Sequence, residues 1–206
     1  MRLIFILLCV WSIKVIADPA DRLYELLAKS DSLTANFEQN QFTETGELIE
    51  TSHGNVSIAK PDQLRWHVLS PFEQLIVTNG IWLWQYDVEL EQAVRRPHPK
   101  NAATSPLMVF VEPLSRLREV YKVEQQSDRC YVLEAHDDKS MFTLMTLCFD
   151  AADNLADMSL VDGFGQKTEV FLQQLKSNFI PLPEIFEFVP PENVEVVIEE
   201  GYVPGI

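Results

Sequence analysis

Apolar and polar residues alternate in short runs along the first half of the chain. Alternation of period two places successive side chains on opposite faces of a strand, so it predicts strands with one buried face. Turn-forming residues such as Thr45-Gly46 and Asn79-Gly80 separate the runs. Short strands at even spacing indicate an antiparallel sheet or barrel. The alternating apolar positions are Leu33, Ala35, Phe37, Val56, Ile58, Leu64, Trp66, Val68, Trp82, Trp84 and Tyr86.

Two segments depart from this alternation. Residues 19–30 carry three leucines on one helical face, and residues 104–122 predict two short helices interrupted by a proline. Strands resume after residue 120, and residues 185–189 resemble a last edge strand before a pair of prolines. The chain is therefore predicted to be an α+β domain of about ten strands with a few short helices.

The first seventeen residues have the features of a cleaved export signal. An arginine precedes an apolar run over residues 3–13, and small residues lead up to Ala17. The run is too short to span a membrane and is followed by Lys14. We expect cleavage near Ala17, which leaves a single domain over residues 18–206 and changes the net charge from −15 to −17 because two cations are removed.

Cleavage leaves two of the three cysteines. The first, Cys9, follows a leucine where a lipid-attachment signal requires a small residue, so we expect no lipidation. Cys130 and Cys148 lie on either side of a predicted hairpin and face each other if Lys139 is at its centre. An oxidising compartment favours a disulfide between them, and the alternative is two buried free thiols.

Charge and motif content exclude several functions. With 16 Lys and Arg against 31 Asp and Glu, the chain is unsuited to binding nucleic acids or anionic lipid surfaces. It lacks a nucleophile elbow, a phosphate-binding glycine loop and a His-Glu-x-x-His motif, and its four histidines are scattered. We expect no enzymatic activity, metal or cofactor. The basic cluster of Arg95, Arg96, His98 and Lys100 predicts an exposed turn or a docking patch for an acidic partner.

Three stretches, in order, resemble the LolA family of periplasmic lipoprotein carriers. They are residues 59–67 (AKPDQLRWH), residues 71–93 (PFEQLIVTNGIWLWQYDVELEQA) and residues 186–196 (FEFVPPENVEV). The resemblance implies an incomplete, strongly curved antiparallel β-barrel of about ten or eleven strands. Short α-helices would form a lid over an apolar cavity. The alternating positions of Phe37, Trp66, Trp84 and Tyr86 are equally compatible with a packed core and with the lining of such a cavity.

The resemblance also implies a function and a set of site residues. Family members are periplasmic monomers that take acylated lipoproteins from an inner-membrane ABC transporter (LolCDE-like), shield the acyl chains and hand them to an outer-membrane acceptor (LolB-like). Lys60, before Pro61, stands where the family has an arginine that ties the lid to the barrel. The residues expected to line the cavity and lid are Phe37, Leu64, Trp66, Ile76, Trp84, Tyr86, Leu107, Met108 and Phe110. The alternatives are a lipid-sensing regulator on the same scaffold and a lipid hydrolase.

Overall fold

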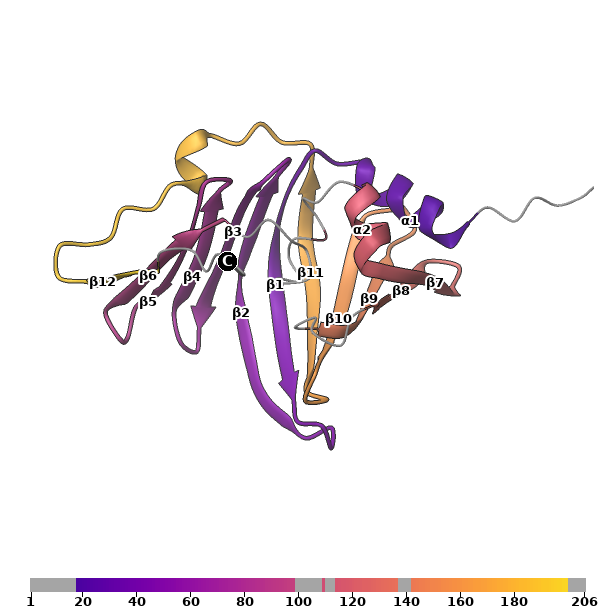
Figure 1. Cartoon of the computed structure of the whole chain (residues 1–206), viewed down its shortest axis with the longest axis horizontal. Coiled ribbons are helices and arrows are strands. Elements are labelled where there is room, and N and C mark those ends of the chain that lie inside the picture. The colour runs from indigo at the N-terminus through magenta and orange to yellow at the C-terminus, as the bar shows by residue number, and fades with distance from the viewer. Residues whose placement is uncertain (1–17, 99–108, 110–113, 137–141, 200–206) are drawn as a thin grey trace, which may run out of the picture.

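The computed structural model describes residues 18–98, 109, 114–136 and 142–199, and a single twelve-stranded sheet dominates it (Figure 1). The strands are β1 (Ser32–Phe42), β2 (Leu48–Ala59), β3 (Gln63–Ser70), β4 (Gln74–Asn79), β5 (Trp82–Asp87), β6 (Gln92–Pro97), β7 (Tyr121–Ser127), β8 (Cys130–Ala135), β9 (Phe142–Phe149), β10 (Leu155–Asp162), β11 (Lys167–Ser177) and β12 (Glu195–Ile198).

The strands follow the order β12-β6-β5-β4-β3-β2-β1-β11-β10-β9-β8-β7 across the sheet. All neighbours are antiparallel except β12 and β6, which run parallel. The two edge strands, β12 and β7, lie far apart in Figure 1, so the curved sheet stays open. The predicted incomplete antiparallel barrel is confirmed.

Two α-helices and a short 3-10 helix accompany the sheet. They are α1 (Pro19–Ala28), α2 (Leu114–Val120) and η3 (Pro183–Phe186). The side chain of Asp18 caps α1 by accepting a hydrogen bond from the Ala20 N–H at 3.0 Å, with the helix starting at a proline. Among the described residues, no helix is both long and apolar enough to cross a membrane. The predicted helix near the N-terminus is confirmed, whereas residues 1–17 lie outside the described part.

The main hydrophobic core lies between α1 and one face of the sheet, which we call the inner face. Leu23 and Leu26 of α1 are buried there, with 0% and 5% of their surface exposed. Alternate positions of the strands supply the remainder of this core because period two sends every second side chain to the same face. These include Ala35, Phe37, Val56, Ile58, Leu64, Trp66, Leu133, Met145, Leu147, Met158, Leu160 and Val170.

The register of the β8–β9 hairpin agrees with the prediction. Cys130 pairs directly with Cys148, and their sulfur atoms are 2.09 Å apart in a disulfide. The predicted turn between the strands falls largely on residues 137–141, outside the described part of the chain.

The predicted strand over residues 185–189 is wrong. Its first two residues complete η3, and the segment that follows belongs to no strand and makes a turn at residues 192–193 before β12 begins at Glu195. Proline at the start of η3 fixes a helical backbone angle, and Phe186, with 2% of its surface exposed, anchors the segment. The last strand is β12, which pairs with β6.

Candidate functional site

Four of the predicted lining residues lie together on the inner face. Phe37 and Trp66 stack with their ring centroids 4.0 Å apart, and Trp66 pairs directly with Ile76 on β4. Leu64 lies two residues before Trp66 on the same face of β3. Phe37, Leu64 and Trp66 have 3%, 3% and 6% of their surface exposed, so each is enclosed by its neighbours.

A glycine makes room for the aromatic stack. Gly54 on β2 is the direct partner of Phe37 and of Val68 on the strands at either side. A Cβ atom at this position would lie 2.6 Å from Cζ of Phe37 and 2.0 Å from the carbonyl oxygen of His67. Both distances are far inside van der Waals contact, so the Phe37 ring occupies space that any other residue would need. The sequence alone contained no signal that singled out Gly54.

The stack borders a small apolar pocket inside the barrel. The pocket has a volume of about 10 Å³, room for about one water molecule. The described side chains around this pocket are therefore closely packed. The lining residues are Leu33, Val56, Ile58, Trp66, Leu155, Met158 and Leu172. Met158 and Leu172 were predicted to lie on strands, but nothing in the sequence indicated which face they would occupy.

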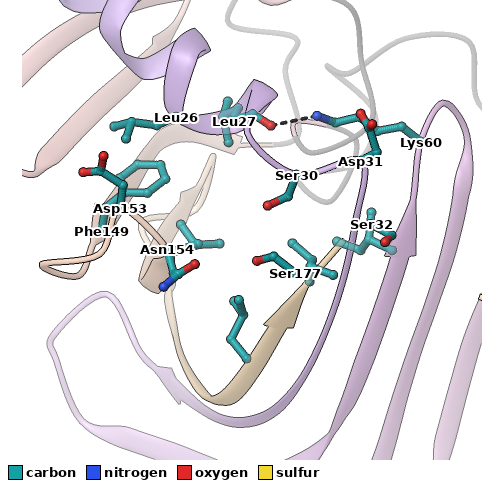
Figure 2. A pocket seen from close by; sticks show the side chains of 14 residues that line it. Leu26, Leu27, Ser30, Asp31, Ser32, Lys60, Phe149, Asp153, Asn154 and Ser177 are labelled. Carbon is teal, nitrogen blue, oxygen red and sulfur yellow. Dashed lines mark hydrogen bonds between the residues drawn. The ribbon is translucent and has the colours of Figure 1, made fainter. Parts of the chain in front are cut away.

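A second pocket of about 40 Å³ lies beside the first, under the C-terminal end of α1 (Figure 2). The two pockets share Leu33, Ile58 and Leu155, so these side chains separate the second pocket from the first. Its remaining walls are mixed, because α1 supplies two leucines while the surrounding turns and strand ends supply polar groups. Those polar groups are Ser30, Asp31, Ser32, Lys60, Asp153, Asn154 and Ser177. An apolar interior that opens past a polar rim suits an amphipathic ligand.

Lys60 ties one side of this second pocket to α1. Its Nζ donates a hydrogen bond to the carbonyl oxygen of Leu27 at 2.7 Å (Figure 2). Burial lowers the pKa of Lys60, and the nearby carboxylate of Asp31 partly opposes this effect. Pro61 follows through a cis peptide bond and is exposed. Lys60 therefore joins the barrel to α1, and its role as a lid latch stays a prediction.

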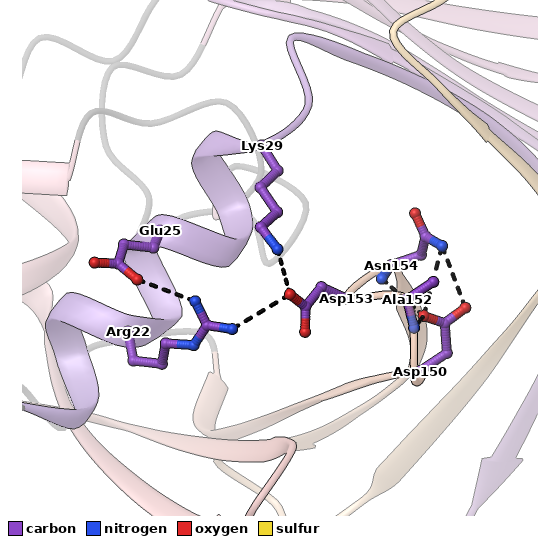
Figure 3. Close-up of polar contacts among 7 residues, drawn as sticks. All are labelled: Arg22, Glu25, Lys29, Asp150, Ala152, Asp153 and Asn154. Carbon is purple, nitrogen blue, oxygen red and sulfur yellow. Dashed lines mark hydrogen bonds and ion pairs between the residues drawn. The ribbon is translucent and has the colours of Figure 1, made fainter.

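Asp153 ties the opposite side of the pocket to the same helix (Figure 3). Its carboxylate accepts hydrogen bonds from Lys29 and from Arg22, the latter at 3.3 Å. The hydrogen bond from Lys29 is the main reason that the pKa of Asp153 lies below its usual value. Asp153 has a φ of 64°, a conformation that costs most residues energy and that aspartate tolerates. Sequence reasoning missed this residue.

The helix α2 adds a third attachment for α1. Arg118 of α2 forms an ion pair with Asp21 of α1, and its guanidinium carbon is 5.1 Å from the ring centroid of Tyr24. The helix α1 is thus held on its exposed side by charged groups and on its buried side by leucines. Of the predicted lid residues, Leu107, Met108 and Phe110 lie outside the described part, while Val109 between them is 2% exposed and belongs to the main core.

Trp84 and Tyr86 do not line the inner pocket, so this part of the prediction is wrong. The register pairs Gln85 with Ile76 on the inner face and therefore turns Trp84 and Tyr86 to the opposite, outer face. There both rings contact Phe188, with centroids 5.4 and 5.3 Å away. Trp66 and Trp84 both lie in strands with alternating apolar residues. The alternation does not specify how each strand pairs with its neighbours, so it could not show that the two side chains lie on opposite faces of the sheet.

The polar pair of Thr78 and His98 is the arrangement most like a nucleophile with its base. Thr78 Oγ1 lies 2.8 Å from His98 Nδ1, and Asp62 Oδ1 lies 4.0 Å from His98 Nε2. However, Thr78 has 1% of its surface exposed and its hydroxyl also accepts a hydrogen bond from the Gly80 N–H. A substrate cannot reach it, so the pair joins strands instead. Within the described ranges, no three His, Cys, Asp or Glu side chains are placed to hold a metal ion.

Comparison with known proteins agrees with this architecture. The family model described as "Outer membrane lipoprotein carrier protein LolA" matches residues 28–189. An outer-membrane lipoprotein carrier protein of Azotobacter vinelandii is 30% identical over 182 residues, which cover 86% of this chain and 87% of that protein. The protein of the same name from Legionella pneumophila (strain Lens) is 32% identical over 200 residues, covering 95% and 98%.

A solved structure supports the fold. The crystal structure of an uncharacterized conserved protein from Thermus thermophilus superimposes with a TM-score of 0.56 at 15% identity, covering 88% of this chain and 100% of that one. The match of the family model over most of the chain, together with relatives above 30% identity, shows that this protein belongs to the LolA family of outer-membrane lipoprotein carrier proteins.

Proposed function

We propose that this protein carries acylated lipoproteins across the periplasm. It receives them from an inner-membrane ABC transporter, shields their acyl chains on the inner face and delivers them to an outer-membrane acceptor. Export through cleavage near Ala17 would leave one carrier domain over residues 18–206. The observation that carries the proposal is the apolar interior of a LolA-family fold beneath a helix that polar contacts hold in place.

The close packing of the described inner-face side chains suggests how binding and release are balanced. Burying a methylene contributes about 0.8 kcal/mol, so several acyl chains in a rigid empty cavity would bind too tightly to leave. Here the inner side chains pack on one another and on α1. Cargo must displace that packing and the contacts of Lys60 and Asp153, which lowers its net affinity. Transfer to a better acceptor can then proceed without nucleotide.

The direct test is incubation of the protein with inner-membrane vesicles that contain a lipoprotein and the releasing transporter. A soluble one-to-one complex with the lipoprotein is the expected result, and no release would contradict the proposal. Liberation of free fatty acid would instead indicate a hydrolase.

A charged substitution on the inner face should block this release. Leu64→Glu places a carboxylate among apolar side chains, where burial of an uncompensated charge is unfavourable. It should reduce the amount of soluble complex by about tenfold or more, and Trp66→Glu should have the same effect. Ile76→Glu is the second variant because Ile76 is only half-buried and its replacement is less disruptive to folding.

The matched control is Leu69→Glu, the same exchange on the same strand at a position with 51% of its surface exposed. Circular dichroism would verify that each variant is folded. Folded Ile76→Glu protein that releases as much lipoprotein as Leu69→Glu would contradict the assignment of the inner face to the acyl chains.

A further inference from the structure

The outer face of the sheet near its β12 edge carries an aromatic cluster built around one arginine. We call Trp82, Trp84, Tyr86 and Phe188 the outer aromatic cluster. The guanidinium carbon of Arg95 lies 4.6 Å from the ring centroid of Trp82 and 5.6 Å from that of Trp84. The Nε atom of Arg95 is buried without a hydrogen-bond partner among the described residues.

Arg95 differs from several other cations that the structure describes on this scaffold. Arg22, Lys29 and Arg118 pair with carboxylates, and Arg65 donates to the carbonyl oxygen of Ile185 at 3.4 Å. Acidic residues outnumber basic ones 31 to 16, so a carboxylate of the chain itself is easily available to most cations. Within the described part of the chain, Arg95 forms no ion pair, and its guanidinium group lies against two indole rings.

The rings of Trp82 and Trp84 lie against the guanidinium group of Arg95. The N–H groups of a guanidinium that stacks on aromatic rings point outward in its own plane. A planar carboxylate accepts two such hydrogen bonds at once. Burial of the Nε atom places part of the charge of Arg95 in a medium of lower polarity, which strengthens its attraction to an anion.

Apolar side chains surround this cation on the same face. The pairing of β12 with β6 sets Val196 beside Ala93 and Ile198 beside Arg95, whereas Glu195 pairs with Gln92 and faces the other way. Val196, Ile198 and Trp82 have 41%, 54% and 37% of their surface exposed. Tryptophan, tyrosine and arginine beside aliphatic residues are the composition of protein-binding hot spots.

We propose that this outer face is a docking surface for an acidic segment of a partner protein. The segment places a carboxylate on Arg95 and an apolar side chain against Trp82 and Ile198. Charge complementarity identifies the partner, because no carboxylate of the described residues pairs with Arg95. A protein segment fits better than a membrane, since one carboxylate needs only one arginine whereas an anionic lipid surface is bound by a cluster of basic residues. This inference is independent of the cargo in the interior.

Selection from a random dodecapeptide library displayed on phage tests the proposal, with the exported protein immobilised. We expect enriched peptides to contain Asp or Glu next to an aromatic or aliphatic residue. Synthetic copies of these peptides should bind Arg95→Gln about tenfold more weakly than the unaltered protein. Arg95→Lys should fall between the two because lysine keeps the charge but loses the two-pronged geometry.

Arg96→Gln is the matched control. It removes the same charge from the adjacent residue, whose pairing with Leu83 sets it on the inner side of β6. Equal weakening by Arg96→Gln, enrichment of peptides without acidic residues, or no enrichment at all would overturn the proposal. Binding of phosphatidylglycerol vesicles that is lost in Arg95→Gln would overturn it in favour of a membrane surface.

Discussion

The two faces of the sheet are both rich in aromatic residues but are covered in different ways. On the inner face, Phe37 and Trp66 belong to the same core as the leucines of α1, and charged and polar contacts hold this helix in place. On the outer face, Trp84 and Tyr86 lie under the segment that leads to β12 and carries Phe186 and Phe188.

The two covers, α1 on the inner side and the segment between β11 and β12 on the outer side, differ in how firmly they are attached. Exposed ion pairs each contribute little to stability, so the contacts that hold α1 can be exchanged at small cost. The outer cover is fixed at both ends, by β11 before it and by the pairing of β12 with β6 after it. It is also anchored by a phenylalanine with 2% of its surface exposed. This contrast supports the proposal that the inner face is the one that opens for a ligand, while the cover of the outer face stays in place.

Removing the anchor of the outer cover should have the largest effect on stability. Phe186→Ala should lower the free energy of unfolding by about 3–5 kcal/mol, because a large buried ring leaves a cavity behind. Urea unfolding measures this change. The folded fraction should still take up a fluorescent fatty acid, since the inner face is intact. Val189→Ala, at a position 85% exposed in the same segment, is the control. Loss of uptake in folded Phe186→Ala protein would show that the two faces are coupled.

Filling the space beside Phe37 should have the next largest effect. Gly54→Ala should lower the free energy of unfolding by about 2–3 kcal/mol, because its Cβ would overlap a backbone oxygen and displace the Phe37 ring. Gly163→Ala is a matched control, since a Cβ there meets no atom within 4 Å. Equal stability of the two variants would show that the inner face accommodates an added methyl group as easily as an exposed turn does.

Loosening α1 should have the smallest effect on global stability and a visible effect on local opening. Asp153→Asn removes the charge that Lys29 and Arg22 share, while asparagine tolerates the same backbone conformation. Hydrogen exchange should show lower protection for α1 with protection in β5 unchanged. Asp150→Asn is the control, because Asp150 bonds only within its own turn in Figure 3.

Acid should reproduce this loosening in the unaltered protein. The folded-state pKa of Asp153 is lowered, so its contribution is complete above the usual pKa of an aspartate and is lost as the pH falls toward the folded-state pKa. Protection factors of α1 in the two proteins should therefore converge at low pH. A difference that persists below that range would show that charge is not what holds the helix.

Much of the architecture was predictable because it depends on local patterns. Period-two alternation indicated the strands, the three leucines indicated α1, and the position of Lys139 set the pairing of Cys130 with Cys148. The inner positions of Leu64 and Trp66 followed from their spacing on one strand. The contact of Lys60 with α1 was anticipated only through the resemblance to the LolA family.

What could not be predicted depends on pairing between strands. A one-residue change in register moves every side chain of a strand to the other face, so Trp84 could not be separated from Trp66 by its pattern alone. The roles of Gly54 and Asp153 depend on contacts with residues distant in the sequence. Residues 185–189 have the composition of a strand, but burial of Phe186 against the outer face prevailed over that preference.

The sequence by itself determined that this protein is a β-rich domain with an amphipathic first helix, because side-chain periodicity and turn chemistry act over a few residues. The tertiary structure decided which aromatic residues face the interior and which face outward. It also decided that Arg95 has indole rings, and no carboxylate of the described residues, beside it. These properties depend on the register between neighbouring strands and on which strands pair. Both are set by the packing of the whole molecule and not by any local pattern.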